Sequence, residues 1–233
     1  MGLLRFKKQK AFRIDKNTLI TDARYVVIDT ELTGLNEKRD SIVSIGAIRM
    51  IGGNIDLSDT FYQLVKPDAS FTAESVVIHE ITPSEVTEKP DIHEVLSEFL
   101  QFCGSDNIVG HCVSIDLSFI NREMKKFFGV TLQNPVIDTF SLYTWIRTRV
   151  SDQSCFSVLP KSSVLYDVAE CFGISVHGAH NAIEDAFITA QLFQRLIPVL
   201  FGLQIKNLKE LLRIGNPSKG VEMVGLSGEI GNL

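Results

Sequence analysis

Short apolar runs and amphipathic stretches alternate along most of this chain, and their periodicities predict an ordered series of strands and helices. Three apolar runs joined by short polar turns come first, which predicts an antiparallel meander. They cover residues 23–31, 41–51 and 54–67. After them, stretches with helical apolar spacing are separated by short apolar runs. The expected helices cover residues 89–103, 116–128, 138–149, 163–174 and 181–200, and short strands are expected at 107–111 and 134–137. A meander followed by alternating helices and strands predicts the α/β class, with a mixed sheet flanked by helices.

The same pattern divides the chain into one domain and two flanking segments. We expect the domain over residues 22–200, which contain no internal repeat and no low-complexity linker. Residues 1–21 form a basic arm, which is either a solubilising tail or a segment that binds phosphate or a partner. The cationic side chains in the first sixteen residues are Arg5, Lys7, Lys8, Lys10, Arg13 and Lys16, against Asp15 alone.

Residues 201–233 form a glycine-rich segment with one apolar repeat. Ile205, Leu208 and Leu212 lie at helical spacing, which predicts a short amphipathic helix within residues 203–212. This helix either packs back on the domain or docks onto a polymerase or another partner.

Composition excludes several classes of protein. With 233 residues and 45% hydrophobic content, the chain can bury one core of ordinary size. No apolar run reaches the roughly 18 to 20 residues of a membrane span, and the first residues lack a signal-peptide pattern. The four cysteines show no CxxC pairing, which is typical of reduced thiols in a cytoplasm. We therefore expect a cytoplasmic protein without a membrane partner. The net charge of −5 at first sight argues against nucleic acid, whose binding usually requires a basic balance.

Two carboxylates end the first predicted strand, in the stretch DTELTGL. Asp29 and Glu31 are two positions apart, so their side chains point to the same face of the strand. Without a counter-ion they would repel each other, and burial would raise their pKa values. A divalent cation removes that repulsion, and oxygen ligands suit Mg²⁺ or Mn²⁺ better than zinc. Taken alone, the pair is also typical of ordinary acids beside a turn.

Three further polar residues lie at the ends of predicted elements. Asp116 begins a predicted helix after a short strand, where it is either a metal ligand or a helix cap. His180 precedes Asp185 by five residues, and five residues of continuous helix would turn them apart by about 140°. A shared site therefore requires His180 to lie before the helix, and Asn181 is a suitable cap at that break.

Together, DTELTGL, IVGHCVSIDLSFIN and HNAIEDAFITAQLF resemble the three motifs of the DEDDh 3′-to-5′ exonuclease family, particularly those of the proofreading epsilon subunit of bacterial DNA polymerase III. The resemblance covers roughly residues 24–200. It implies a ribonuclease-H-like mixed sheet, two Mg²⁺ or Mn²⁺ ions, and release of nucleoside 5′-monophosphates from a DNA 3′ end. It also implies single-stranded DNA as the substrate, a DNA polymerase subunit as a partner, and a role in proofreading or repair.

The resemblance assigns a role to each residue of the motifs. Asp29, Glu31, Asp116 and Asp185 would bind the metal ions, and His180 would be the general base. His177 does not fit the family motif, because it lies eight residues before Asp185. Two divalent ions would add four positive charges to the net charge of −5 and bring it to −1, so the acidic total is compatible with a nucleic-acid substrate.

By the same resemblance, Thr33 and Leu35 would contact the terminal nucleotide, with the leucine wedged against the last base. A turn threonine and a core leucine are the alternative interpretation. Leu32 and Cys112 depart from the family, which commonly has threonine and asparagine at these positions. These departures concern substrate preference and rate rather than the chemistry.

Two other functions fit the sequence. An exoribonuclease of the same family would use the same five residues and differ only in discrimination at the 2′-hydroxyl group. A non-catalytic polymerase accessory or binding module would keep the fold alone. The intact carboxylates argue against this module, because a protein without catalysis has no reason to hold repelling acids together.

Overall fold

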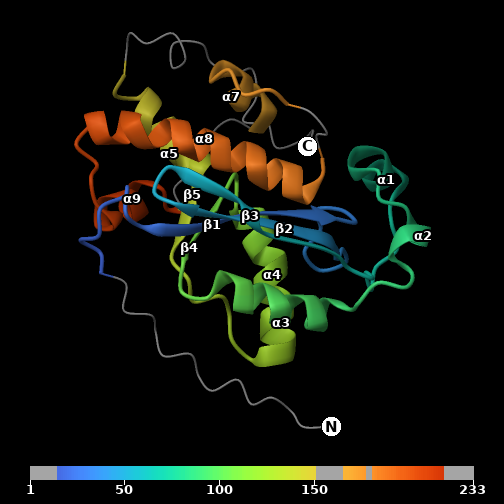
Figure 1. The fold of residues 1–233 in the computed structure, drawn as a ribbon. Helices are drawn as coiled ribbons and strands as arrows, with labels where there is room; N and C mark the ends of the chain where they lie inside the picture. Colours follow the sequence, from blue (N-terminus) through green and yellow to red (C-terminus); the bar gives the residue numbers. More distant parts are fainter. Residues whose placement is uncertain (1–14, 151–164, 177–179, 218–233) are drawn as a thin grey trace.

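A five-stranded mixed sheet forms the centre of the molecule in the computed structural model, which describes residues 15–150, 165–176 and 180–217 (Figure 1). Its strands are β1 (Arg24–Leu32), β2 (Ile42–Ile51), β3 (Asn54–Leu64), β4 (Asn107–Gly110) and β5 (Val136–Asp138). They lie in the order β3-β2-β1-β4-β5. The pairs β1–β2 and β2–β3 are antiparallel, whereas β1–β4 and β4–β5 are parallel. The meander and the mixed sheet expected from the sequence are therefore confirmed.

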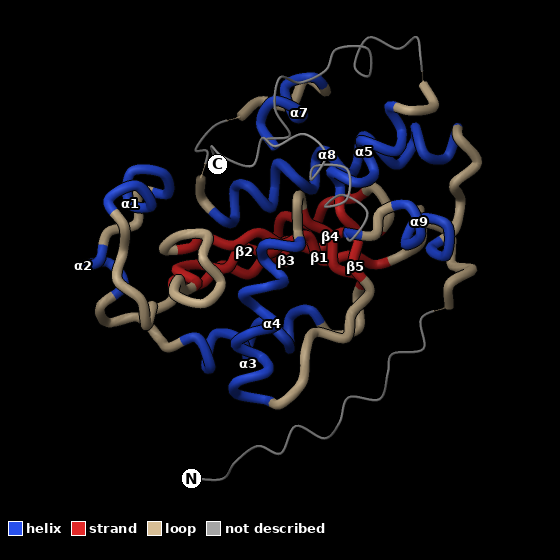
Figure 2. Tube along the Cα trace, turned by 180° about the vertical axis from the view of Figure 1, so that it is seen from behind, coloured by secondary structure: helices blue, strands red, loops and turns tan. Residues whose placement is uncertain are grey.

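Helices cover both faces of this sheet. They are α1 (Ala73–His79), α2 (Pro83–Val86), α3 (Ile92–Cys103), α4 (Ser114–Phe128), α5 (Thr139–Arg147), α7 (Leu165–Cys171), α8 (Ala182–Gly202) and α9 (Leu208–Ile214). Figures 1 and 2 show α3 and α4 on one face, and α5, α7 and α8 on the other. No helix in the described part of the chain combines the length and the apolar content that crossing a membrane requires.

The sequence pattern did not predict α1 and α2. Both are short and largely exposed, so they lack the apolar periodicity that reveals longer helices. Each begins at a threonine: Thr72 accepts a hydrogen bond from the Ser75 amide, and Thr82 forms a capping box with Glu85. Local capping therefore defines these helices, rather than burial of an apolar face.

Alternation along β1 decides which residues face α8. Val26 and Ile28 pack in the core under α3 and α4, whereas Tyr25 and Val27 pack in the core under α8. All four side chains are fully buried, which stabilises the sheet by about 1.5 to 3 kcal/mol for each apolar side chain. The next side chains of the α8 series are the carboxylates at positions 29 and 31.

The first residues of α8 lie directly against β2. A Cβ atom at Gly46 would overlap the backbone of Ala182, so only glycine allows this close approach. Gly46 is also the antiparallel partner of Asp29 on β1. Asn181 caps the helix by accepting a hydrogen bond from the Ile183 amide at 3.2 Å. The contact therefore brings the start of α8 to the strand that carries the carboxylate pair.

The C-terminal helix α9 overlaps only the second half of the stretch expected at residues 203–212, and it packs on the domain beside α5 and β5 (Figure 2). Leu208, Leu211 and Ile214 are buried, whereas Leu212, which was expected to face inward, is only partly buried. The backbone of residues 16–18 pairs with residues 208 and 209, which ties the described start of the chain to α9. The cationic residues at positions 5–13 and the glycine-rich residues from 218 onward lie outside the described residues. The domain boundaries at residues 22 and 200 stay predictions.

Candidate active site

Three carboxylates from two elements meet at the end of β1. Asp29, Glu31 and Asp185 each place one oxygen so that all three atoms lie within 4.8 Å of one another. The first two come from β1 and the third from the first turn of α8. Glu31 and Asp185 are buried and Asp29 is half-buried. Among the described residues, no lysine or arginine forms an ion pair with any of them.

Asp116 lies beside this cluster without belonging to it. The Thr30 hydroxyl group donates a hydrogen bond to Asp116 Oδ1 at 2.6 Å, which holds the carboxylate against β1. Asp116 does not cap α4, because Val113 occupies that position. Besides burial, its negative charge raises the pKa of both Asp29 and Glu31, so Asp116 interacts electrostatically with the cluster.

Burial and mutual repulsion raise the pKa values of the acids at this site. Burial, followed by Asp185 and Asp116, raises the pKa of Glu31 to about 8. Burial raises the pKa of Asp116 to about 7, against the opposing effect of the Thr30 hydrogen bond. The pKa of Asp29 is raised well above its usual range by burial and by its three acidic neighbours, and burial raises that of Asp185. Protons or a bound cation would relieve this repulsion.

The cluster fits a divalent cation that prefers oxygen ligands. Asp185 Oδ1 is buried and has no hydrogen-bond partner among the described residues, whereas Oδ2 of the same carboxylate accepts one from Tyr166. A buried oxygen without a partner is costly unless another ligand satisfies it. Three convergent carboxylates with such an oxygen provide the type of donor set that Mg²⁺ and Mn²⁺ bind.

His180 lies immediately before α8, as a site shared with Asp185 requires. Its backbone is left-handed, with φ of 66°, and the residue is exposed. Its amide donates a hydrogen bond to Tyr166 Oη at 2.8 Å, and its Nδ1 atom lies 3.3 Å from the same oxygen. Tyr166 Oη in turn donates to Asp185 Oδ2 at 2.6 Å. One tyrosine therefore contacts both functional groups of the third motif.

Tyr166 belongs to none of the three sequence motifs. It lies 14 residues before His180 and 19 before Asp185, in α7, and no motif spacing connects it to them. Burial and the Asp185 carboxylate raise the pKa of Tyr166, so the phenol stays protonated and remains a donor. The only signal in the sequence is a polar aromatic residue within an amphipathic stretch, which is too common to be informative.

Thr33 and Leu35 follow β1 and have different environments. Thr33 is fully buried, and its hydroxyl group accepts a hydrogen bond from the Ser41 amide at 3.0 Å. Leu35 is 54% exposed, so it is not a core residue and is accessible to a ligand. Leu32 is buried in the core under α3 and α4. Cys112 has a left-handed backbone, and burial raises the pKa of its thiol to about 12.

The remaining histidines of the motif regions have structural partners. His79 Nδ1 accepts a hydrogen bond from the Ile81 amide at 3.1 Å. His111 Nδ1 lies 2.9 Å from the Thr139 hydroxyl oxygen. His177 lies outside the described residues.

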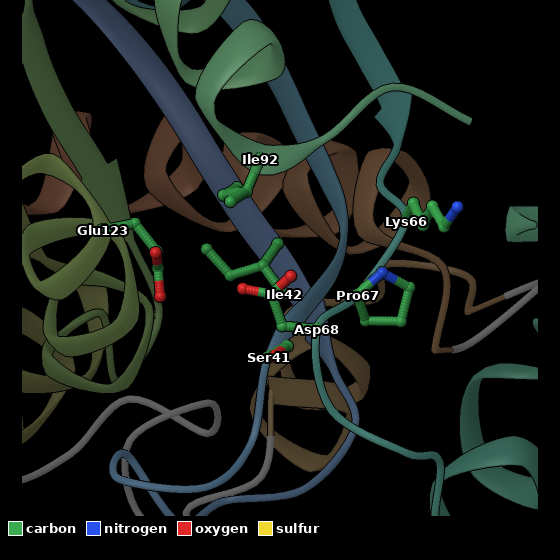
Figure 3. Close-up of a pocket in the computed structure, with 7 residues that line it drawn as sticks. All are labelled: Ser41, Ile42, Lys66, Pro67, Asp68, Ile92 and Glu123. Atoms are coloured by element: carbon green, nitrogen blue, oxygen red, sulfur yellow. The ribbon is translucent and has the colours of Figure 1, made fainter. Parts of the chain in front are cut away.

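A pocket on the opposite face shows how a buried acid is stabilised elsewhere in this chain (Figure 3). It lies between the start of β2, the segment after β3, and helices α3 and α4. Glu123 lines it and is buried, but Arg122 and Lys126 approach its oxygens at 2.6 and 3.6 Å. The charge of Glu123 is thus compensated by protein cations, unlike that of the carboxylate cluster on β1.

The part of the chain that carries these site residues is similar to known exonucleases and polymerase subunits. The family model RNase_T, described as an exonuclease, matches residues 26–193. The chain is 33% identical to DNA polymerase III subunit epsilon of Aquifex aeolicus (strain VF5) over 192 residues, which are 82% of this chain and 88% of that protein. It is 34% identical to the PolC-type DNA polymerase III of Thermotoga maritima over 194 residues, but it spans only 13% of that much longer protein.

Solved structures share the fold at lower identity. Exonuclease X in complex with 5′ overhanging duplex DNA superposes with a TM-score of 0.62 at 22% identity, covering 82% of this chain and 99% of that one. E. coli exonuclease I in complex with a dT13 oligonucleotide gives a TM-score of 0.62 at 18% identity, over 78% of this chain and 43% of that one. The ribonuclease-H-like fold expected from the sequence is therefore confirmed.

Proposed function

Because this chain belongs to the RNase_T exonuclease family, we propose that it is a metal-dependent 3′-to-5′ exonuclease that releases nucleoside 5′-monophosphates from DNA 3′ ends. One observation carries the proposal: three carboxylates, Asp29, Glu31 and Asp185, converge within 4.8 Å. No cation of the described residues pairs with them. Such an arrangement is costly in the free protein and useful only when it binds positive charge.

In this proposal, Asp29, Glu31, Asp116 and Asp185 hold two Mg²⁺ or Mn²⁺ ions. When bound, two such ions stabilise the attacking and the leaving oxygen of an in-line displacement at phosphorus. Asp116 is included because its carboxylate is held against β1 by Thr30, next to the cluster.

His180 acts as the general base. It takes a proton from the attacking water as the water oxygen bonds to phosphorus. The bond between phosphorus and the 3′ oxygen of the preceding nucleotide breaks, that oxygen takes a proton from solvent, and the terminal nucleotide leaves with its 5′ phosphate. The exposure of His180 supports this role, because a base must meet both water and substrate.

Leu35 contacts the terminal nucleotide in this proposal. It is the exposed apolar residue that follows the carboxylate strand, and an apolar side chain can pack against a base. Thr33 supports it by holding the turn through the Ser41 amide. The substrate is a single-stranded 3′ end, and the similarity to a polymerase III epsilon subunit supports action beside a DNA polymerase in proofreading or repair.

The test is digestion of a single-stranded DNA oligonucleotide labelled at its 5′ end, with and without Mg²⁺ or Mn²⁺. We expect a ladder that shortens from the 3′ end only when a metal is present. Asp29→Asn and His180→Ala should each lower the rate, the latter by about 10²- to 10⁴-fold. Asp22→Asn and His93→Ala are matched controls, because both residues are exposed and neither lies among the site residues.

Two results would contradict the proposal. One is the absence of any shortened product with either metal, and the other is undiminished activity in both site variants. A matched RNA oligonucleotide in the same assay decides between the deoxyribonuclease and the exoribonuclease, because only the 2′-hydroxyl group differs. Binding of the oligonucleotide without any cleavage would point instead to the non-catalytic accessory module.

A further inference from the structure

Tyr166 connects the two residues of the third motif that the proposed chemistry uses. We propose that Tyr166 is a positioning residue, whose hydroxyl group holds the Asp185 carboxylate and the His180 ring in one fixed arrangement. The inference rests on the proposed function, because it assigns Tyr166 a part in the same site. The tyrosine itself touches neither metal nor substrate in this scheme and acts through its two partners.

Three polar contacts and one ring contact converge on this side chain. Its Oη atom donates a hydrogen bond to Asp185 Oδ2 at 2.6 Å and accepts one from the His180 amide at 2.8 Å. His180 Nδ1 lies 3.3 Å from the same oxygen. The tyrosine and histidine rings meet edge to face, with centroids 5.1 Å apart and an interplanar angle of 88°.

The hydrogen bond from Tyr166 gives the two oxygens of the Asp185 carboxylate different roles. Oδ2 accepts a hydrogen bond from the phenol, whereas Oδ1 is buried and no residue in the described part of the chain forms a hydrogen bond with it. The carboxylate therefore cannot turn without losing the phenol, and Oδ1 stays available as a ligand. Partners of this kind orient metal-binding carboxylates, and their loss typically lowers metal affinity or activity by about 10- to 100-fold.

The contacts to His180 determine which ring nitrogen carries the proton. A phenol has one hydrogen, and an ionised carboxylate can only accept, so the hydrogen of Tyr166 points to Asp185. Towards His180 the oxygen can then only accept, which requires hydrogen on Nδ1 of the neutral ring. Nε2 is left without a proton, as a general base requires.

Tyr166 also restrains the backbone conformation of His180. A left-handed conformation, here with φ of 66°, is disfavoured for residues other than glycine and persists only where the surroundings hold it. The hydrogen bond from the His180 amide to Tyr166 supplies such a restraint. Tyr166 is itself anchored, because Leu165, Val168 and Ala169 of α7 are buried in the core and α7 packs on α8 (Figure 1).

The experiment compares Tyr166→Phe with Tyr25→Phe. Both variants lose a hydroxyl group that forms a hydrogen bond, but Tyr25 donates to the Ile20 carbonyl oxygen at 2.8 Å, in a different part of the core. Phenylalanine keeps the edge-to-face contact with His180, so the first variant isolates the hydroxyl group. Mn²⁺ binding to the DNA-free protein is measured by electron paramagnetic resonance. The values of kcat and KM are measured on single-stranded DNA, and the His180 tautomer is determined from ¹⁵N nuclear magnetic resonance.

For Tyr166→Phe we expect Mn²⁺ affinity to fall by about 10- to 100-fold. We expect kcat to fall by about 10-fold or more while KM for DNA changes by less than about 3-fold, because the substrate contacts are untouched. The His180 ring should change from the Nδ1-protonated form to a mixture of tautomers. Tyr25→Phe should lower thermal stability and leave the other three measurements at their native values.

Native Mn²⁺ affinity and native kcat in Tyr166→Phe would overturn the inference, as would equal losses in Tyr25→Phe. An Nε2-protonated His180 in the native protein would overturn it as well, and this measurement needs no variant that must fold. Failure of the proposed function has a different signature: the native chain would bind Mn²⁺ in a Tyr166-dependent way and yet degrade no nucleic acid.

Discussion

Neutralising one carboxylate of the cluster should stabilise the metal-free protein, and Glu31→Gln is the variant for which the magnitude can be worked out. The pKa of Glu31 rises from its ordinary 4.5 to about 8 in the folded protein. A group with a higher pKa in the folded state makes the folded state bind protons more tightly than the unfolded chain. The free energy of unfolding therefore decreases as the pH rises from 4.5 to 8, and below 4.5 the group contributes nothing.

Each pKa unit corresponds to about 1.36 kcal/mol, so the native glutamate costs about 4 kcal/mol at pH 8 and about 1 kcal/mol at pH 5. Glutamine keeps the shape of the side chain and has no charge to bury. The metal-free variant should accordingly be more stable than the native protein by these amounts, which urea unfolding in EDTA, followed by circular dichroism, will measure at both pH values.

Glu184→Gln is the matched control, because Glu184 is an exposed carboxylate in the same first turn of α8. Its effect should stay within about 0.5 kcal/mol at either pH. Adding Mn²⁺ should narrow the difference between the native protein and Glu31→Gln at pH 8, since the native protein gains about 2.7 kcal/mol at 100 times its Kd and the variant gains less. A variant no more stable than the native protein in EDTA at pH 8, or a gain that does not depend on pH, would refute the reasoning.

Three further substitutions test how the fold presents the site. Gly46→Ala places a methyl group against the backbone of Ala182 and should lower the unfolding free energy by about 1 to 3 kcal/mol; urea unfolding measures this, and weaker Mn²⁺ binding should accompany it because α8 must shift. Asp138→Ala removes the cap that accepts from the Ser141 amide at 3.0 Å and should cost about 0.5 to 2 kcal/mol in the same assay. Leu211→Ala should cost about 2 to 5 kcal/mol, because Leu211 is fully buried; a loss below about 1 kcal/mol would show that α9 is free to dock elsewhere.

Local rules were sufficient wherever the relevant contacts are close in sequence. Alternation along one strand placed Asp29 and Glu31 on a common face, and the need for a break before α8 identified Asn181 as its cap. Asp138, at the start of the helix expected over residues 138–149, likewise caps α5. These features follow from backbone geometry over a few residues, so they can be predicted without knowledge of the fold.

Other features could not be predicted, either because they bury little apolar surface or because the residues in contact are far apart in sequence. Helices α1 and α2 bury too little apolar surface to leave a periodic pattern. Thr30 meets Asp116 across 86 positions, so no spacing rule relates them.

The sequence by itself determined the order of the strands and of the longer helices, the mixed sheet and the three acidic motifs, because each depends on periodicity or on short-range geometry. The tertiary structure alone decided that Gly46 admits the start of α8, that Asp185 thereby reaches Asp29 and Glu31, and that Tyr166 bridges Asp185 and His180. The physical reason is that burial, and with it the pKa of every carboxylate in the cluster, depends on which distant segments pack together. Spacing along the sequence does not reveal which distant segments pack together.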